Sequence, residues 1–457
     1  MTPAEAPRVL SASTADLRSL AATRIGVAGV LLYDLLTRLG DFGAHYTEAG
    51  ALPLALVPAR PLFGNGALSL HLLATSSVAQ GLLFAAALLA ALALLVGHHT
   101  RRATWVSWWL LVSLQARNPH VLYEADVMLG LLLLWGALLP WGQRWSLDAR
   151  GRPAPPLRVS SPAVLGVRLQ TSMALLCALL SKSGDSWRDG SAVGYVLRLD
   201  VYTTELGRWL GGFPRLSPAL TWGTLALELF GPVLVFARGR WRWVGIGLLA
   251  ALQLGFGATL HLGIFPAVFL VALLPFVPTR ATRVVREPRA WVGGAACALI
   301  LLSAAYNAAY LVPALEQRSL TWVARTLHVD QGWGMFAPDP MTDDGWLVIP
   351  ARLADGREVD LLQGGALRWG KPASASDAFG GDRWKELLMA AREAQDEALF
   401  AQLLNYFVAR WDAAHPEAPA LHARLVWVLE ETLPAGEAAP TPETLARWRR
   451  PSALRAR

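Results

Sequence analysis

Long apolar segments separated by short polar ones fill the first two thirds of the chain. An apolar segment of about 20 residues is long enough to cross the hydrocarbon core of a bilayer as a helix. The pattern predicts nine such helices, and His261 separates the seventh from the eighth. Their approximate ranges are 20–39, 70–96, 103–116, 124–140, 162–181, 217–237, 243–259, 261–278 and 290–312. We therefore predict a polytopic α-helical membrane bundle.

The last third of the chain has shorter periodic segments. Two runs of strand-forming residues, 345–349 and 358–362, flank Ala354-Asp355-Gly356 and predict a β-hairpin. A helical pattern covers residues 382–411, and residues 425–430 predict a further strand. These elements indicate a small α+β domain after the bundle.

The arginines between the apolar segments predict how the chain is oriented. Cytoplasmic loops of membrane proteins are enriched in Lys and Arg. Most of the arginines lie in alternate loops, which are cytoplasmic if the N-terminus is cytoplasmic. An odd number of spans then places the C-terminal domain outside the cytoplasm. The predicted parts are a cytoplasmic N-terminal segment 1–19 without a removable signal peptide, a membrane bundle 20–312, an extracytoplasmic α+β domain 313–433, and a loosely ordered tail 434–457.

The composition agrees with a membrane protein and argues against several other classes. With 54% hydrophobic and 16% charged residues, the chain is too apolar for one soluble globule. The net charge of +7 comes from arginines in loops, so we predict no nucleic-acid partner. Cys177 and Cys297 lie in apolar helical runs, which supports neither a disulfide framework nor a zinc site. The chain has no motif with metal-ligand spacing and no phosphate-binding glycine motif, so we expect no metal.

Lys182 is the first candidate for chemistry. The chain holds 41 Lys and Arg residues, yet the only lysines are Lys182, Lys371 and Lys385. Lys182 lies where the fifth apolar segment meets a polar, glycine-containing turn. A lysine can lose its proton and act as a base, which an arginine cannot do. The alternative is an anchor at the end of a membrane helix.

Other ionisable groups in the apolar segments are candidates because charge is costly in a bilayer. Asp126 and His261 lie near the predicted outer surface, at the level of Lys182; a helix-dipole role for Asp126 and an ordinary hydrogen-bonding role for His261 are the alternatives. Glu228 lies in the middle of the sixth segment with no partner one turn away, so it must find one on another helix or stay protonated. Asp34 and Arg38 are four residues apart and predict an ion pair that locks the bundle.

The segment 331–340, just after the last apolar helix, is rich in aromatic residues and proline. We interpret it as an anchor at the membrane interface, with a roof over a cavity between helices as the alternative.

Several separated motifs, in a fixed order from about Arg24 to Leu433, resemble those of one known family. They are Asp34 with Arg38, His45-Tyr46-Thr47-Glu48-Ala49-Gly50, Ser69-Leu70-His71, Arg117-Asn118-Pro119, Ser146-Leu147-Asp148, Lys182 with Trp187 and Gly190, and Trp333 with Phe336, Pro338 and Pro340. Together they resemble the bacterial family of horizontally transferred transmembrane-domain proteins, the bacterial relatives of vitamin K-dependent gamma-carboxylase.

The resemblance implies a fold and a reaction. In the carboxylase a Lys-x-x-x-x-Trp stretch holds the base that acts on the reduced quinone, and Lys182 and Trp187 have that spacing. The implied cofactor is a reduced vitamin K or menaquinone-type quinone, with O₂ and CO₂ as co-substrates. The implied substrate is a glutamate in a secreted peptide or protein. The resemblance implies Lys182 as the base, with Trp187 beside it. Together with the groups singled out above, the predicted site consists of Lys182, Asp126 and His261 as catalytic residues and Trp187, Asn118 and Glu228 as quinone-binding residues.

The chain also departs from the carboxylase pattern. Asp126 lies near the position where the carboxylase has a histidine, and the C-terminal part is much shorter than the luminal part of the carboxylase. The rival hypothesis is therefore a non-catalytic membrane factor for the maturation or export of a secreted peptide. A transporter is a third hypothesis, but it would need inverted repeats, and none is visible in the sequence. We expect a multi-pass protein of the bacterial inner membrane, surrounded by lipid.

Overall fold

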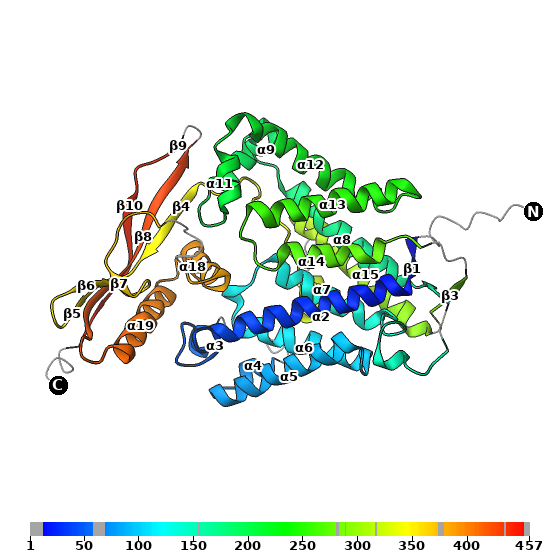
Figure 1. Cartoon of the computed structure of the whole chain (residues 1–457), viewed down its shortest axis with the longest axis horizontal. Helices are drawn as coiled ribbons and strands as arrows, with labels where there is room; N and C mark the ends of the chain where they lie inside the picture. Colours follow the sequence, from blue (N-terminus) through cyan, green and yellow to red (C-terminus); the bar gives the residue numbers. More distant parts are fainter. Residues whose placement is uncertain are drawn as a thin grey trace, which may run out of the picture.

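The computed structural model describes residues 12–57, 69–153, 156–279, 283–287, 289–315, 318–372, 379–433 and 436–451. Figure 1 shows a bundle of long helices that run along the longest axis of the molecule, with a smaller sheet-containing domain at one end. The first described residues, from residue 12 on, lie toward the opposite end. This mostly helical architecture with a small sheet region confirms the predicted fold class in outline.

Each of the nine predicted apolar segments contains a helix. These helices are α2 (Leu17–Gly40), α5 (Ser77–Val96), α6 (Thr100–Arg117), α7 (Glu124–Leu138), α8 (Pro162–Ser181), α12 (Ser217–Leu234), α13 (Arg240–Thr259), α14 (Phe265–Leu273) and α15 (Ala290–Leu311). Shorter helices connect or follow them: α3 (Phe42–Tyr46), α4 (Leu70–Leu73), α9 (Asp185–Asp189), α10 (Ala192–Val196), α11 (Glu205–Gly211) and α16 (Arg318–Thr326). The predicted break at His261 is confirmed, because it lies between α13 and α14.

The number of membrane crossings is smaller than predicted. Among the residues that the structure describes, four helices are long and apolar enough to cross a membrane, namely α2, α5, α8 and α15. The nine predicted crossings are therefore not supported. With 15 and 9 residues, α7 and α14 are short for a crossing of about 20 residues. The helices α6 and α13 are less apolar because they contain arginine and tryptophan side chains. The helix α12 is less apolar because it contains Glu228 and two prolines.

Three short strands tie together the end of the bundle that lies far from the sheet-containing domain. They are β1 (Thr14–Asp16), β2 (Arg158–Ser160) and β3 (Val284–Arg286). β2 pairs antiparallel with β1 and parallel with β3. Figure 1 shows β1 and β3 at this end. The predicted N-terminal segment 1–19 thus contributes a strand and the start of α2, while residues 1–11 lie outside the described part of the chain.

The C-terminal domain is built around the long strand β8 (Ala420–Leu433). Its other strands are β4 (Asp343–Val348), β5 (Pro350–Leu353), β6 (Glu358–Asp360), β7 (Gly365–Ala366), β9 (Gly436–Glu437) and β10 (Thr441–Arg449). The order is β10-β8-β5-β6-β7, and β4 and β9 also pair with β8. The predicted hairpin exists between β5 and β6, but the run at 345–349 lies mainly in β4, which pairs with β8 instead.

Two further predictions for this domain need correction. The helical pattern at 382–411 forms two helices, α18 (Asp382–Ala394) and α19 (Glu397–Ala414), because Gln395 adopts a left-handed conformation with φ of 48°. The segment from residue 434 on is not loosely ordered throughout, since β10 pairs with β8 along most of its length. Residues 434–435 and 452–457 lie outside the described part of the chain.

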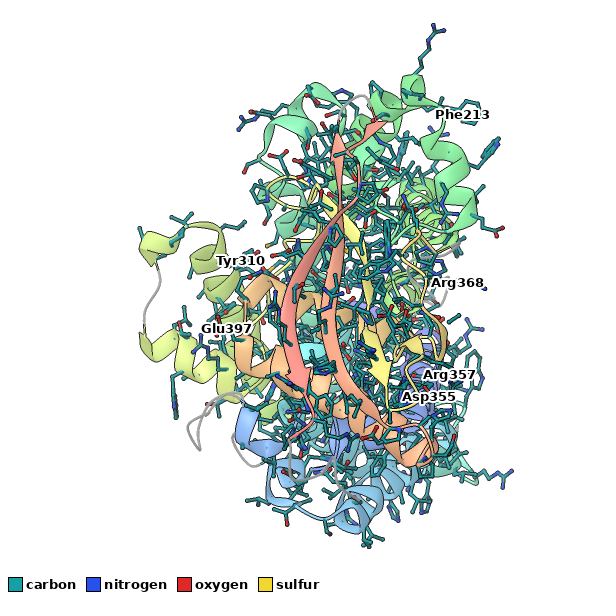
Figure 2. All side chains as sticks on the ribbon, turned by 90° about the vertical axis from the view of Figure 1, so that its left-hand side faces the viewer. Phe213, Tyr310, Asp355, Arg357, Arg368 and Glu397 are labelled. Carbon is teal, nitrogen blue, oxygen red and sulfur yellow. The ribbon has the colours of Figure 1, made fainter. Side chains whose placement is uncertain are left out.

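The helices α18 and α19 lie between the sheet and the bundle (Figure 1). Their apolar core is shared with loops of the bundle, because Leu52, Val121 and Val201 belong to the same buried cluster as Trp384 and Phe407. Figure 2 looks at the molecule from the side of this domain; the long strands cross the middle of the view, and Asp355 and Arg357 mark the β5–β6 turn at its edge. The domain is thus packed onto the bundle by an extensive apolar interface.

Close packing inside the bundle gives a first prediction. A Cβ atom at Gly166 of α8 would lie 2.2 Å from the indole ring of Trp135 in α7. Both residues are buried, so neither can move into solvent. We expect Gly166→Ala to destabilise the protein by about 1–3 kcal/mol through overpacking, measured as a lower thermal unfolding temperature in detergent.

Gly130 provides the matched control, because it is a buried helical glycine of α7 with nothing within 4 Å of the position that an added methyl group would take. Gly130→Ala should leave stability unchanged or raise it by up to about 1 kcal/mol through helix propensity. Equal effects of the two substitutions would contradict the close approach of α7 and α8.

Candidate functional site

Lys182 and Glu228 form a buried ion pair near the end of α8. Lys182 Nζ lies 3.0 Å from Glu228 Oε1, and each side chain is only 4% exposed. Lys182 Nζ also donates to the carbonyl of Ala178 at 3.2 Å. The ring centroid of Trp187 lies 5.2 Å from the same nitrogen. The structure therefore confirms that Glu228 has its partner on another helix.

This ion pair lines an apolar cavity of about 370 Å³. Among the described residues that line the cavity, Lys182 and Glu228 are the ionisable ones, and most of the others are aliphatic or aromatic. The helices α10, α12 and α13 contribute many of them. Glu228 Oε2 is buried and has no hydrogen-bond partner. The cavity thus offers a charged pair with a spare acceptor oxygen in an otherwise apolar space.

The segment 331–340 closes one side of this cavity. Met335 and Phe336 line it, and the indole nitrogen of Trp187 donates to the carbonyl of Phe336 at 2.8 Å. The hydroxyl of Ser186 donates to Asp339 Oδ1 at 2.5 Å, and its backbone N–H donates to the same oxygen at 2.9 Å. These bonds hold the pKa of Asp339 below its usual value. The observed contacts match the roof interpretation of this segment.

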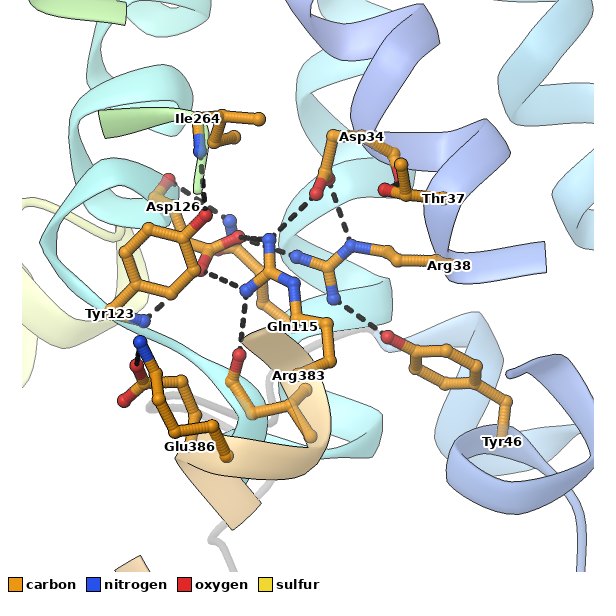
Figure 3. Close-up of polar contacts among 12 residues, drawn as sticks. Asp34, Thr37, Arg38, Tyr46, Gln115, Tyr123, Asp126, Ile264, Arg383 and Glu386 are labelled. Carbon is orange, nitrogen blue, oxygen red and sulfur yellow. Dashed lines mark hydrogen bonds and ion pairs between the residues drawn. The ribbon is translucent and has the colours of Figure 1, made fainter. Parts of the chain in front are cut away.

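Asp126 lies elsewhere, in a network of four buried charges (Figure 3). Arg38 Nε donates to Asp34 Oδ2 at 2.8 Å, which confirms the predicted pair. Arg38 also donates to Asp126 Oδ1 at 2.5 Å. Arg383 donates to Asp34 Oδ1 and to Asp126 Oδ2, both at 2.6 Å. All four side chains are at most 9% exposed, and Tyr46 accepts a further bond from Arg38 at 2.7 Å.

The other predicted site residues also lie apart from Lys182. His261 lines a separate cavity of about 390 Å³, and its carbonyl accepts a bond from Lys385 Nζ at 3.0 Å. Asn118 is buried, and its side chain donates to the carbonyl of His45 at 3.2 Å. Neither residue lines the Lys182 cavity. Of the six predicted residues, the structure brings together Lys182, Trp187 and Glu228 and leaves Asp126, His261 and Asn118 in other places.

A neighbouring polar cavity contains groups that the sequence analysis did not single out. It has a volume of about 360 Å³, shares Met335 and Phe336 with the Lys182 cavity, and is also lined by Tyr202, Lys385 and Glu386. Lys385 Nζ lies 4.4 Å from the ring centroid of Tyr202. Burial raises the pKa of Glu386 to about 7. The rarity of lysine in this chain is a signal that would have pointed to Lys385.

One acidic cluster has the size of a metal site. Carboxylate oxygens of Asp200, Glu430 and Glu437 lie within 4.8 Å of one another. Lys371 Nζ contacts all three carboxylates. These carboxylates raise the pKa of Lys371, so its ammonium group supplies the positive charge that a cation would supply. The cluster is an ion-pair site that joins the domain to the loop at Asp200.

Comparisons of the chain with protein-family models, curated proteins and solved structures found no match.

The four-charge network predicts a large effect of one substitution. Arg383→Gln would leave Asp34 and Asp126 buried with Arg38 as their shared guanidinium partner. Removing one partner of a buried ion pair typically costs about 3–5 kcal/mol. We expect a lower unfolding temperature in detergent and faster proteolysis of the C-terminal domain.

Arg357→Gln is the matched control, because the Arg357 side chain is 66% exposed and pairs with Asp355 at the surface. Its effect on stability should stay below about 1 kcal/mol. If Arg383→Gln were as mild as this control, the network would not hold the domain on the bundle.

Proposed function

We propose that the chain is an integral membrane enzyme that removes a proton from a reduced quinone in the Lys182 cavity. The observation that supports this most directly is the buried Lys182–Glu228 pair, which lines an otherwise apolar cavity. A cavity of about 370 Å³ lies within the usual range of small-molecule sites. Its apolar walls suit a quinone ring and part of its isoprenoid chain, and the charged pair suits a ring hydroxyl.

The proposed chemistry begins with general-base catalysis. The hydroxyl of a hydroquinone is a weak acid, so its proton must be transferred to a positioned acceptor. The Lys182–Glu228 pair supplies that acceptor, and Trp187 packs beside it. The resemblance to gamma-carboxylase extends the proposal: a vitamin K or menaquinone-type quinol supplies the reducing power for oxygenation by O₂, coupled to carboxylation by CO₂ of a glutamate in a secreted peptide or protein.

The proposed setting is the bacterial inner membrane, with the nine helices of the apolar segments embedded in it. Apolar side chains on α12 and α13 support this arrangement, since Phe230, Val233 and Trp243 are each more than half exposed. The arginine-rich end with β1, β2 and β3 would face the cytoplasm. The C-terminal domain and the Lys182 end of α8, which begins next to β2, would then lie toward the extracytoplasmic surface.

A non-catalytic maturation or export factor is the competing function. The contact between Lys182 and Glu228 is the observation in favour of this function, because an ion-paired lysine at a helix end can have a purely structural role. The two functions differ in whether the protein consumes quinol.

The first test of this function is quinone epoxide formation in membranes that carry the protein, supplied with reduced menaquinone or vitamin K and with O₂. We expect epoxide from the wild type and at least a 100-fold loss in Lys182→Ala, because the substitution breaks the pair that takes up the proton. Arg188→Ala is the control; it changes an exposed side chain in the same segment.

Two results would contradict the proposal. Membranes with folded wild-type protein that form no more epoxide than empty membranes would favour the non-catalytic factor. Full activity of Lys182→Ala would place the reaction outside this cavity.

The proposed orientation predicts the labelling of engineered cysteines. In spheroplasts, a membrane-impermeant maleimide should label Arg357→Cys at the β5–β6 turn and should label Arg152→Cys only after permeabilisation. Cys297 is exposed and would be replaced by serine, whereas Cys177 is buried and is left in place. The reverse labelling pattern would invert the topology.

A further inference from the structure

We propose that Glu228 accepts the proton of the quinol and that Lys182 stays protonated and stabilises the oxyanion that forms. This assignment builds on the proposed function and differs from the role that the resemblance implies for Lys182. It arises from the contacts of the two side chains.

Three described groups contact Lys182 Nζ, and each of them favours an ammonium ion. The carbonyl of Ala178 and the Oε1 atom of Glu228 are acceptors at 3.2 Å and 3.0 Å. The face of the Trp187 ring, 5.2 Å away, attracts a cation because it carries partial negative charge. The lone pair of a neutral amine would point toward one of these electron-rich groups. Lys182 is thus arranged to keep its proton.

Glu228 has the free acceptor of the pair. One of its oxygens, Oε1, is used by Lys182, while Oε2 is buried without a hydrogen-bond partner. A buried polar atom without a partner destabilises the ligand-free cavity. A hydroxyl group of a ligand in the cavity would satisfy it, because an ionised carboxylate can only accept hydrogen bonds. The hydroxyl of a quinol is such a group.

The proton-transfer step balances without a further reactant. The O–H bond of the quinol breaks, and its proton forms a bond to Glu228 Oε2. The electron pair of the broken bond stays on the quinol oxygen as a phenolate. Glu228 becomes neutral, so the ammonium of Lys182 loses one counter-ion and gains another in the phenolate. The total charge in the cavity does not change, and a positioned cation at a developing oxyanion lowers the barrier.

The two possible bases predict opposite effects of conservative substitutions. If Glu228 is the acceptor, Lys182→Arg keeps a cation beside the oxyanion and should retain activity. If Lys182 is the acceptor, the same substitution abolishes activity, because a guanidinium stays protonated. The two hypotheses also differ for Glu228→Gln. This substitution removes the proton acceptor if Glu228 is the base. If Lys182 is the base, the loss of the negative charge favours the neutral amine that proton transfer to lysine requires.

The experiment measures quinol anion formation without O₂, in the purified full-length protein in lipid nanodiscs. Reduced menaquinone is added, its binding is followed by quenching of tryptophan fluorescence, and the anion is followed by its absorbance. We expect Glu228→Gln to bind quinol but to form the anion at least 100-fold more slowly. Glu228→Asp should be slowed less, Lys182→Arg should stay within about tenfold of wild type, and Glu205→Gln, an exposed carboxylate of α11, should match wild type.

The outcomes separate this assignment from the proposed function. Loss of anion formation in Lys182→Arg with quinol binding intact overturns the role of Glu228, whatever the glutamate variants do. Wild-type rates in Glu228→Gln also overturn it. If the wild type itself neither binds quinol nor forms the anion, the proposed function fails instead. Equal unfolding temperatures of the variants in detergent would show that folding does not explain a loss.

Discussion

The buried ion pairs among Asp34, Arg38, Asp126 and Arg383 are the constraint on which the arrangement of the two domains depends. They join α2 and α7 of the bundle to α18 of the C-terminal domain (Figure 3). Removing charges from water costs several kcal/mol per ion, so a buried network is tolerated only when every charge is paired. Two carboxylates and two guanidinium groups meet this condition together. If one of them moved out of the network, its partners would remain buried with an unpaired charge. The domain is therefore fixed in one orientation on the bundle.

The position of α18 in turn fixes part of the surroundings of the Lys182 cavity. Lys385, two residues after Arg383, bonds the carbonyl of His261 and lies over the ring of Tyr202. The ring of Tyr202 meets that of Phe336 edge to face at 5.7 Å, and Phe336 lines the cavity. A continuous set of contacts thus connects the four-charge network to the wall of the cavity. This explains how a domain outside the bundle contributes to a site among its helices.

Features set by neighbours in the sequence could be predicted, and features set by distant partners could not. The helices, the break at His261 and the Asp34–Arg38 pair follow from local patterns, and each is present in the structure. The partner of Asp126 could not be predicted, because Arg383 lies 257 residues further along the chain. The same holds for β10, whose polar sequence gives no strand signal and which is ordered by pairing with β8.

The number of crossings and the location of the site show a similar division. Each of the nine apolar segments forms a helix, yet among the described residues only four of these helices are long and apolar enough to cross a membrane. The other five are too short or contain too many polar side chains. For the site, the spacing of Lys182 and Trp187 and the unpaired position of Glu228 were readable signals. Depth in the membrane was a weaker signal, since it grouped Asp126 and His261 with Lys182 although Asp126 lies in the four-charge network and His261 lines another cavity.

The two buried ionic sites differ in the property that separates structural from chemical roles. In the four-charge network, both oxygens of Asp34 and both oxygens of Asp126 accept bonds from arginines, so each carboxylate oxygen has a partner within the protein. Members of both sites line cavities, Asp34 and Arg383 in one case and Lys182 and Glu228 in the other, but in the Lys182–Glu228 pair one carboxylate oxygen has no partner. A saturated network is stable without a ligand, whereas an unsaturated buried carboxylate carries a cost that a ligand hydroxyl removes. The incomplete bonding of Glu228 is therefore the physical reason to place the chemistry there and to assign the network to architecture.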